Sequence, residues 1–284
     1  MVDLHQIRQT IARECGVYPE SPPHPVAGGC INESFRLGDY FVKINSLARV
    51  EMFETEHLGL SILGATGAIR TPRPVCIGKG KEHAFFILEY LPLNRLDPAA
   101  QERLGCELAA LHRASASHFG WERDNYLGTT KQPNSHRASW MDFFRDQRLD
   151  HILQLARACG YSFRGADYLL AHLDRFFETD PPPCLLHGDL WAGNAGMLKD
   201  GTPVIFDPVV YFGDREVDLA MTNLFGGFSP LFQRAYQQAW PLLPGHENRF
   251  ELYNLYHILN HAVLFGRSYA HQAQGMIDHL VARL

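Results

Sequence analysis

The sequence predicts an α+β fold in two lobes, with a small antiparallel-sheet lobe over residues 1–91 and a mostly helical lobe over residues 92–284. Short apolar runs separated by glycine turns, typical of strands, fill most of the first segment. Helical periodicity dominates the second segment, and Pro92 ends the last strand of the first. A chain of 284 residues is long enough to bury a large core, either as one domain or as two lobes.

The composition is that of a soluble globular protein without a nucleic-acid or membrane partner. Hydrophobic residues make up 46% of the chain and charged residues 20%. The net charge of −5 and the pI near 6.3 imply no broad basic face. No apolar run is long enough to span a bilayer, and the N-terminus lacks the basic and apolar regions of a secretory signal. We therefore expect a cytoplasmic protein.

The cysteines and histidines give no sign of a zinc site. The six cysteines are scattered without a C-x-x-C pair, which excludes a zinc ribbon and argues against a disulfide framework. The 15 histidines form no HExxH pair. Within the last long helical stretch, we interpret His257, Asn260 and His261 as satisfied polar groups and not as ligands.

The first lobe begins with a helix over residues 4–15, where apolar side chains recur at helical spacing. Several prolines then enforce an extended link. Residues 26–37 predict a hairpin that turns at Gly28-Gly29, and the following segments predict a strand over 40–45, a helix over 50–63 and strands over 75–78 and 84–91. In the strand over 40–45, alternation places Phe41 and Lys43 on one face.

The second lobe is predicted to contain helices over residues 98–112, 140–160, 163–178, 213–221, 229–240 and 249–272. Residues 119–134 show little periodicity and predict a structured loop that lines a site. In the helix that opens near residue 213, Asp218 is either a structural brace or a metal ligand, and the structural role is the one that we favour.

The stretch Cys184–Asn194, followed by 204–208, carries the chemistry. Each segment reads as an apolar strand that ends in polar residues, so Asp189 and a buried Asp207 are expected to converge from the ends of neighbouring strands. His187 is expected to order the loop. For any one of these residues, a capping Asp or a turn Asn in an ordinary strand-turn-strand unit is the alternative interpretation.

Together these residues suit phosphoryl transfer. Asp189 and Asn194 have the spacing of the catalytic-loop Asp and Asn in H-x-D-x-x-x-x-N, and Asp207 follows where kinases keep the main metal Asp. A carboxylate is needed to accept a hydroxyl proton, and oxygen ligands are needed for Mg²⁺. The sequence thus predicts a protein-kinase-like fold that binds ATP and Mg²⁺.

The first lobe supplies the expected nucleotide contacts. Lys43 followed by Glu56 on a helix matches the kinase ion pair that holds phosphates. Backbone N–H groups at Gly28, Gly29 and Cys30 could lie over phosphates, although a plain hairpin turn is the alternative. Backbone groups of the segment Glu89, Tyr90 and Leu91 are expected to pair with adenine.

The chain resembles the fructosamine kinase / ketosamine-3-kinase family, within the aminoglycoside-phosphotransferase-like kinases. The resemblance covers nearly the whole length and is carried by the segments 28–32, 40–45, 52–56, 88–91, 120–128, 187–194, 206–208 and 211–220. His-Gly-Asp-x-x-x-x-Asn marks the superfamily. Trp191 within this motif, with Gly-Asp-Arg-Glu downstream, indicates the ketosamine kinase branch.

The resemblance implies phosphorylation of the 3-hydroxyl of a ketosamine, on a small amine or a protein lysine, with ATP and Mg²⁺. The adduct then breaks down, which is a deglycation role. By the same resemblance, Asp189 is the base, Asn194 and Asp207 hold Mg²⁺, and Trp191 lies beside the sugar. Asp124 and Asn125 are further candidates for sugar contact.

Two other functions remain open from the sequence. One is a kinase for another hydroxylated amine or sugar, such as an aminoglycoside or choline, and the other is a nucleotide-binding pseudokinase with a regulatory role. A further hypothesis concerns Cys30, whose thiol pKa could be lowered by nearby N–H dipoles and Lys43. Its oxidation could then link two chains as a disulfide dimer; an unreactive loop thiol is the alternative.

Overall fold

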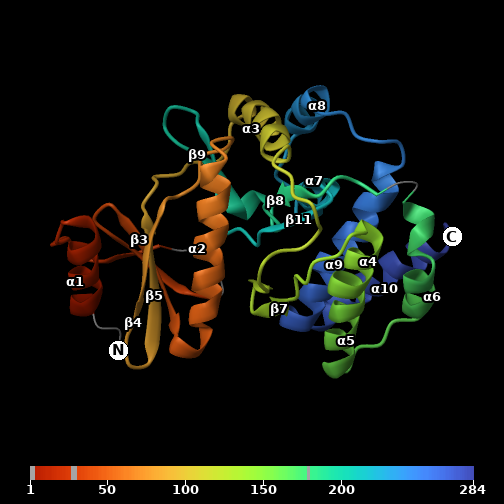
Figure 1. Ribbon diagram of the computed structural model, residues 1–284, viewed down its shortest axis with the longest axis horizontal. Coiled ribbons are helices and arrows are strands. Elements are labelled where there is room, and N and C mark those ends of the chain that lie inside the picture. Colours follow the sequence, from red (N-terminus) through yellow and green to blue (C-terminus); the bar gives the residue numbers. More distant parts are fainter. Residues whose placement is uncertain (1–3, 27–30, 178–179) are drawn as a thin grey trace.

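The computed structural model describes residues 4–26, 31–177 and 180–284 and shows two lobes side by side (Figure 1). The N-terminal lobe contains a five-stranded sheet, and the C-terminal lobe is mostly helical. The predicted α+β architecture is therefore confirmed. Gly28, Gly29 and Cys30 lie outside the described residues, so the structure does not test the phosphate-covering turn or the Cys30 dimer.

The sheet of the N-terminal lobe has the spatial order β1-β2-β3-β5-β4, and all neighbouring strands are antiparallel. The strands are β1 His24–Pro25, β2 Glu33–Leu37, β3 Tyr40–Ser46, β4 Pro74–Lys79 and β5 His83–Glu89. The predicted strands are present, although β5 ends at Glu89, before the predicted end at Leu91.

Helices α1 (Leu4–Cys15) and α2 (Val50–Ala65) cover opposite faces of this sheet. In β5, Phe85 and Ile87 pack in the cluster of α1, whereas Phe86 and Leu88 pack in the cluster of α2. Because successive side chains of a strand alternate between faces, β5 is buried on both sides.

The same alternation decides where Lys43 lies. In β3, Val42 and Ile44 pack in the α1 cluster, and Phe41 packs against the α2 cluster. Lys43 therefore lies on the α2 face, next to the helix that carries Glu56, as the sequence predicts.

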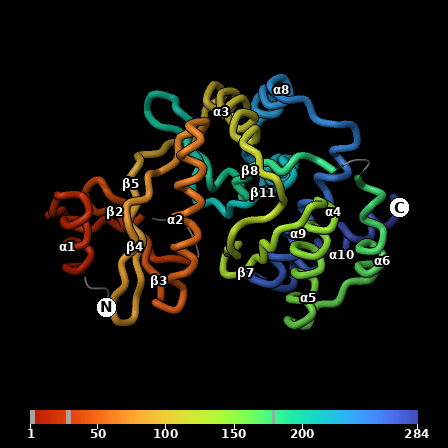
Figure 2. Tube along the Cα trace, viewed as in Figure 1, coloured from red at the N-terminus to blue at the C-terminus, as the bar shows by residue number. Residues whose placement is uncertain are grey.

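The C-terminal lobe packs its helices around two hydrophobic clusters. The helices are α3 Pro98–Leu111, α4 Trp140–Phe144, α5 His151–Ala158, α6 Ala166–Ala171, α7 Glu216–Leu224, α8 Pro230–Ala239, α9 His246–Phe265 and α10 Arg267–Val281. Although α3 and α8 are distant in sequence, they lie side by side (Figure 2). Asp97 caps α3 by accepting a hydrogen bond from the Ala100 N–H at 2.7 Å.

Three predicted helices are interrupted. The stretch over residues 140–160 contains a π-helical segment, Arg145–Asp150, between α4 and α5. The stretch over 163–178 becomes the short α6 and a 3₁₀ turn, Leu173–Phe176. Gly266 has a φ of 97°, which an α-helix cannot contain, so the predicted helix over 249–272 divides into α9 and α10.

Three small antiparallel sheets complete the second lobe. They are β6 Asn125–Leu127 with β7 Thr130–Gln132, β8 Cys184–Leu186 with β11 Tyr211–Gly213, and β9 Ala195–Met197 with β10 Pro203–Ile205. The predicted loop over 119–134 therefore contains a hairpin. The prediction that Asp189 and Asp207 follow neighbouring strands is wrong, because β8 and β10 pair with other strands.

Backbone hydrogen bonds outside these sheets bring the two loops together instead. The Val209 N–H donates to the His187 carbonyl at 2.7 Å, and the Phe206 N–H donates to the Asn194 carbonyl at 3.0 Å. The loops that follow β8 and β10 therefore meet through their own main chains.

Asp218 of α7 braces the loop after β8. Its fully buried carboxylate accepts hydrogen bonds from the His187 N–H at 2.7 Å and the Gly188 N–H at 2.8 Å. It also contacts His112 Nε2 at 3.2 Å. The structural role predicted for Asp218 is confirmed, and the two backbone contacts hold the loop against α7.

The partners of His112 indicate which ring nitrogen carries a proton. A carboxylate only accepts hydrogen bonds, so His112 Nε2 donates to Asp218. Behind the ring, the Tyr236 hydroxyl lies 2.8 Å from His112 Nδ1 and accepts a hydrogen bond from Arg215 Nη1 at 3.1 Å.

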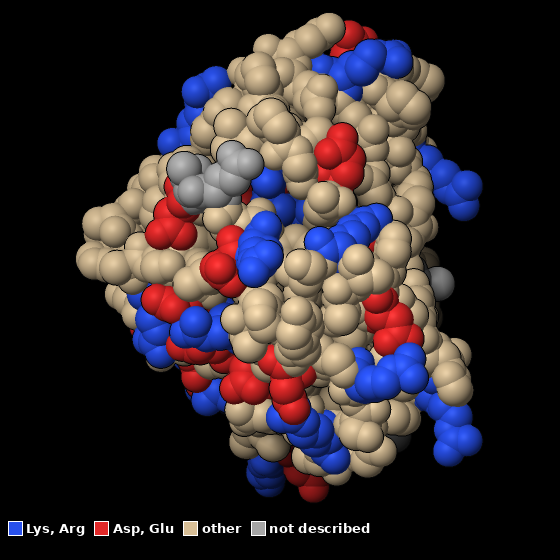
Figure 3. All heavy atoms as spheres, turned by 90° about the vertical axis from the view of Figure 1, so that its right-hand side faces the viewer, with Lys and Arg blue, Asp and Glu red and all other residues tan. Residues whose placement is uncertain are grey.

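Charges of both signs are intermixed on the face shown in Figure 3. Within the described ranges, no helix has both the length and the apolar character required to cross a bilayer.

The surroundings of Gly105 on α3 and Gly275 on α10 predict opposite effects of a Gly→Ala substitution on stability. A Cβ on Gly105 would lie 2.4 Å from the Phe232 carbonyl oxygen, whereas a Cβ on Gly275 meets nothing within 4 Å. Gly105→Ala should lower the free energy of unfolding by about 1–3 kcal/mol through overpacking. Gly275→Ala should raise it by about 0.5–1 kcal/mol through helix propensity. Urea unfolding measures both, and equal effects would contradict the close α3–α8 contact.

Asp218 should make stability depend on pH. Burial alone would raise its pKa, but hydrogen bonds from His112 and Gly188 bring the pKa below the ordinary 3.8. A lowered folded-state pKa means that the ionised group stabilises the fold above the unfolded-state pKa and that this contribution disappears as pH falls through the folded-state pKa. Asp218→Asn should therefore cost about 2 kcal/mol at pH 7 and progressively less below about pH 4.

Urea titrations of parent and variant across this pH range would measure the difference. Asp167→Asn is the matched control, because the Asp167 side chain is 87% exposed. A stability difference between parent and Asp218→Asn that stayed constant from pH 7 to pH 3 would contradict the argument.

Candidate active site

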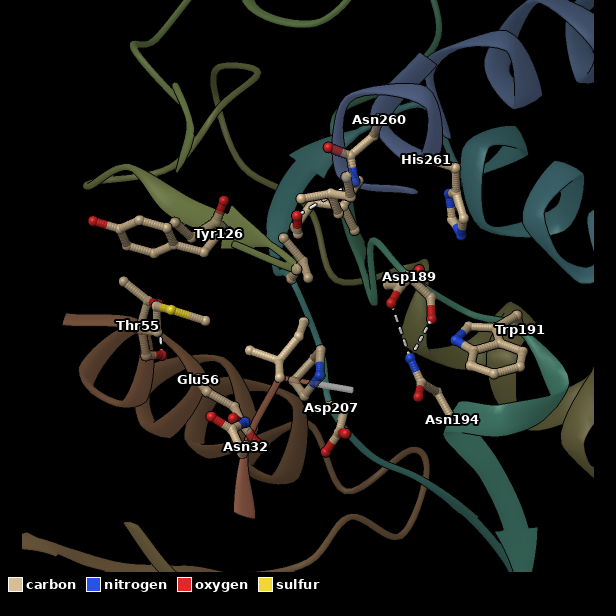
Figure 4. Close-up of a pocket in the computed structure, with 18 of the residues that line it drawn as sticks. Asn32, Thr55, Glu56, Tyr126, Asp189, Trp191, Asn194, Asp207, Asn260 and His261 are labelled. Carbon is tan, nitrogen blue, oxygen red and sulfur yellow. Dashed lines mark hydrogen bonds between the residues drawn. The ribbon is translucent and has the colours of Figure 1, made fainter. Parts of the chain in front are cut away.

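A pocket of about 600 Å³ lies between the lobes and is lined by side chains from both. β3 and α2 contribute from the N-terminal lobe, and β6, α7, α9, α10 and the loops after β8 and β10 contribute from the C-terminal lobe. Figure 4 shows Asp189, Asn194 and Asp207 facing this space together with Glu56. Side chains that are far apart in the sequence are thus brought to one cavity.

Lys43 joins the two lobes at the floor of the pocket. Its Nζ lies 2.6 Å from Glu56 Oε1 and 2.6 Å from Asp207 Oδ1, and the Lys43 side chain is 5% exposed. Burial alone would lower the pKa of Lys43, but the carboxylates of Asp207 and Glu56 raise it above its ordinary value. The ammonium therefore stays charged, and the predicted Lys43–Glu56 ion pair is present.

Helix α2, which carries Glu56, is also held by the other lobe. The Tyr126 hydroxyl in β6 donates a hydrogen bond to Glu51 Oε2 at 2.5 Å. Arg123 lies 3.8 Å from Glu51 and 3.7 Å from Glu54. These contacts limit the rotation of α2 and hence the position of the Glu56 carboxylate.

Asp207 combines an unusual backbone with an accessible side chain. Its φ of 58° is the only positive value among the non-glycine residues that the structure describes. Backbone strain of this kind clusters at functional sites. The side chain is 46% exposed, so the expectation of a buried carboxylate is wrong. The loop turns Asp207 out of the core and into the pocket, where a ligand can reach it.

Asp189 and Asn194 face each other across the loop after β8. Asn194 Nδ2 donates to the Asp189 carbonyl at 2.9 Å and to Asp189 Oδ2 at 3.1 Å (Figure 4). Burial, followed by the negative charge of Asp207, raises the pKa of Asp189 to about 7. A carboxylate with a pKa in this range is suited to accept a proton at neutral pH.

His187 orders this loop, as the sequence predicts. The ring is buried, and burial lowers its pKa, so it is neutral. Nε2 donates to the Phe206 carbonyl at 2.9 Å, and Nδ1 accepts from the Asp189 N–H at 3.3 Å. His187 thus links the two loops that carry Asp189 and Asp207.

The oxygen donors of Asn194 and Asp207 fit a magnesium ion. Both Asn194 Nδ2 hydrogens are directed at Asp189, so the amide oxygen remains as the ligand atom. Among the described residues, no group of three or more His, Cys, Asp or Glu could hold a metal. This donor set matches Mg²⁺, which is typically bound by one or two protein groups together with substrate phosphates.

The expected adenine-binding segment does not border the pocket. The Glu89 N–H donates to the Arg73 carbonyl and the Tyr90 N–H donates to the Asp39 carbonyl, both at 2.9 Å. These two N–H groups are therefore already used by the sheet and its turn, which corrects that part of the prediction. In the described part of the chain, Leu91 retains an N–H without a backbone partner.

The structure places the three residues expected to contact the sugar in different surroundings. Trp191 borders the pocket and is 37% exposed. Asn125 also borders it, but its amide is bonded to the Val210 carbonyl, Gln132 and Asn134. Asp124 does not border the pocket.

The Asp124 carboxylate accepts a hydrogen bond from the Asn134 N–H at 3.0 Å and pairs with Lys131 at 3.2 Å. The prediction of sugar contact by Asp124 is therefore wrong, because this side chain joins the open end of the β6–β7 hairpin.

Several pocket residues on α7, α9 and α10 were not predicted. These are Phe225, Asn260, His261, Leu264, Phe265 and Tyr269. The interpretation of α9 polar groups as satisfied is wrong for two of them: in the described chain, Asn260 Oδ1 and both ring nitrogens of His257 lack a hydrogen-bond partner. Helical periodicity marks this face of α9 as inward, but it does not distinguish a core from a cavity.

Comparisons with known proteins agree with this geometry. The chain matches the family model for fructosamine kinase over residues 4–283. A protein named "Probable ketoamine kinase" from Synechocystis sp. is 45% identical over 280 residues, which is 95% of each chain. Another of that name from Escherichia coli K12 is 38% identical over 261 residues, covering 90% of this chain and 91% of the relative.

Solved structures show the same relationship. A crystal structure of a Haemophilus somnus protein assigned as a fructosamine-3-kinase has a TM-score of 0.90 at 30% identity, covering 96% of each chain. An aminoglycoside phosphotransferase, APH(4)-Ia, has a TM-score of 0.63 at 18% identity, covering 97% of this chain and 98% of the other, and shows the shared fold alone. With this fold, and with a family model that matches almost its whole length, the chain is a kinase that belongs to the fructosamine kinase family.

Proposed function

We propose that this protein uses ATP and Mg²⁺ to phosphorylate a sugar hydroxyl of a ketosamine, with O3 as the expected acceptor. The observation that supports this most is that Lys43, Asp189, Asn194 and Asp207 line one pocket in a member of this family. The relatives named as ketoamine kinases support the substrate class. Phosphorylation at O3 destabilises the adduct, so the proposed role is deglycation of small amines or protein lysines.

The two lobes have different roles in this proposal. Residues 1–91 hold the nucleotide, and residues 92–284 supply the base, the metal ligands and the sugar site. The Leu91 N–H is the group in the connecting segment that we propose for the adenine edge. Residues 28–30 remain the proposed phosphate cover.

Asp189 is the proposed general base. Its carboxylate accepts the proton of the sugar hydroxyl as the hydroxyl oxygen forms its bond to the γ-phosphorus and the bond to the β,γ-bridging oxygen breaks, releasing ADP. The hydrogen bonds from Asn194 fix the carboxylate, and Asp218 fixes the loop that carries it. Asp189 is therefore presented to the hydroxyl in one orientation.

Lys43 is the proposed phosphate ligand. Glu56 keeps its ammonium directed toward Asp207, which is the proposed metal ligand together with Asn194. When bound, Mg²⁺ supplies positive charge against the transferred phosphoryl group. Trp191 presents an exposed ring at the pocket against which an apolar sugar face can stack.

Asp189→Asn should abolish most turnover without removing ATP binding. The amide keeps the shape of the carboxylate but cannot accept the hydroxyl proton, so kcat should fall by about 10²- to 10⁴-fold. ATP affinity, measured by calorimetry, should change by less than about threefold, since the proposed nucleotide ligands are unchanged.

Asp200→Asn is the matched control, because Asp200 is an exposed turn residue that accepts a hydrogen bond from the Thr202 N–H. This control should keep full activity. Turnover retained by Asp189→Asn would assign Asp189 another role.

A substrate panel separates the proposed function from its alternatives. ADP release should be measured with ATP, Mg²⁺ and either a fructosamine, an aminoglycoside or choline. Turnover should appear with the fructosamine and be lost on addition of excess EDTA. ADP release with another substrate alone would favour a different small-molecule kinase. ATP binding without turnover of any compound would favour a pseudokinase.

A further inference from the structure

Aromatic side chains form one part of the pocket wall. We call this group the aromatic collar; it consists of Trp191, Phe225, His261, Phe265 and Tyr269, all of which line the pocket. Trp191 is 37% exposed, Phe225 39% and Phe265 55%. Among the described residues, seven large hydrophobic side chains are exposed, and these are three of them. Their grouping at one pocket indicates a surface that binds a ligand.

The collar is a connected set of rings and not a chance group of surface residues. Phe225 lies between Trp191 and His261, with ring centroids 6.2 and 4.8 Å away. His261 lies 5.4 Å from Phe265 and 5.0 Å from Tyr269. These separations are typical of aromatic pairs, so the rings form one continuous apolar wall.

The collar is held by elements of the helical lobe. Phe225 immediately follows α7, His261 and Phe265 lie on α9, and Tyr269 lies on α10. His261 Nδ1 donates to the His257 carbonyl at 2.8 Å, which fixes the ring. In Figure 4, Trp191 and His261 lie on the same side of the pocket as Asp189.

Charge is distributed unevenly along the pocket. The ionisable acids and the lysine that line it are Lys43, Glu56, Asp189 and Asp207, which come from β3, α2 and the loops after β8 and β10. Burial lowers the pKa of His261, so this ring is neutral at pH 7. Within the described residues that line the pocket, the collar therefore offers no charge to a ligand.

The chemistry of a ketosamine places its amine near this wall. The amine nitrogen is attached to C1 of the sugar, close to the C3 hydroxyl that Asp189 would deprotonate. We infer, resting on the proposed function, that the collar residues beyond the sugar-stacking Trp191 bind the amine-borne substituent of the ketosamine and select aromatic or aliphatic substituents over those that carry a carboxylate.

Two interactions produce this selection. The ring faces attract the protonated secondary amine by cation–π contact, and they remove an apolar substituent from water. A carboxylate on the substituent would lose its hydration on entering the pocket and would not form an ion pair in return, because Lys43 is already paired with Glu56 and Asp207. Phe265 is the most exposed of the three and is the ring that a substituent leaving the pocket would cover.

Fructosamines of benzylamine, butylamine and β-alanine test the inference, since butylamine and β-alanine have similar length and differ in charge. For the parent protein, kcat/KM should be at least about tenfold higher for the benzyl and butyl adducts than for the β-alanine adduct. Phe265→Ala should lower kcat/KM for the benzyl adduct by roughly tenfold, mainly through KM, and change the β-alanine adduct by less than about threefold.

Two further variants sharpen the test. Phe265→Arg should raise kcat/KM for the β-alanine adduct, because it supplies the missing cation. Leu243→Ala is the matched control, since Leu243 is 56% exposed and does not line the pocket, and it should leave all three adducts unchanged. The KM for ATP should be constant throughout.

The outcomes separate this inference from the proposed function. Turnover of all three adducts with equal kcat/KM, or equal losses in Phe265→Ala, would overturn the role of the collar and leave the ketosamine kinase proposal intact. Absence of turnover with every adduct, together with turnover of another substrate, would overturn the proposed function itself. A parent preference for the β-alanine adduct would also overturn the inference.

Discussion

The ammonium of Lys43 is the contact on which the arrangement of the two lobes depends. A buried charge is tolerated when opposite charges compensate it, and here one carboxylate comes from α2 and the other from the loop after β10. The sheet lobe and the helical lobe must therefore approach closely for Lys43 to be satisfied. The same approach creates the pocket and turns the half-exposed Asp207 toward it.

A second buried network of hydrogen bonds positions the loop of Asp189, the proposed base. Asp218 accepts two backbone N–H groups of the loop that leads to Asp189, and His112, Tyr236 and Arg215 stand behind it. Because a carboxylate only accepts hydrogen bonds, the His112 ring and the two backbone N–H groups all donate to Asp218. Asp189, the proposed base, is thus positioned from the core of the helical lobe, whereas Lys43, the proposed phosphate ligand, is positioned from the sheet lobe.

The lining of the resulting pocket contains two chemically different groups of side chains. Carboxylates and the Lys43 ammonium come from β3, α2 and the loops after β8 and β10. Aromatic rings on α9 and α10 and just after α7 form a connected set. In the proposed function, the loops that carry the reacting groups are held in place by hydrogen bonds from the core. The residues proposed to select the substrate lie mainly on helices and take no part in the ion pairs of Lys43.

Periodicity and motif spacing predict the two-lobed α+β architecture, the pairing of Lys43 with Glu56 and the convergence of Asp189 with Asp207. The pairing of the strands, the hydrogen bonds that occupy Asp124 and Asn125, and the cavity beside α9 are known from the folded chain alone. They are not predictable from the sequence because a side chain's role depends on which distant partners satisfy it. Spacing along the chain does not record those partners, so aromatic residues of α9 and α10 that look like core in the sequence became the wall of a pocket.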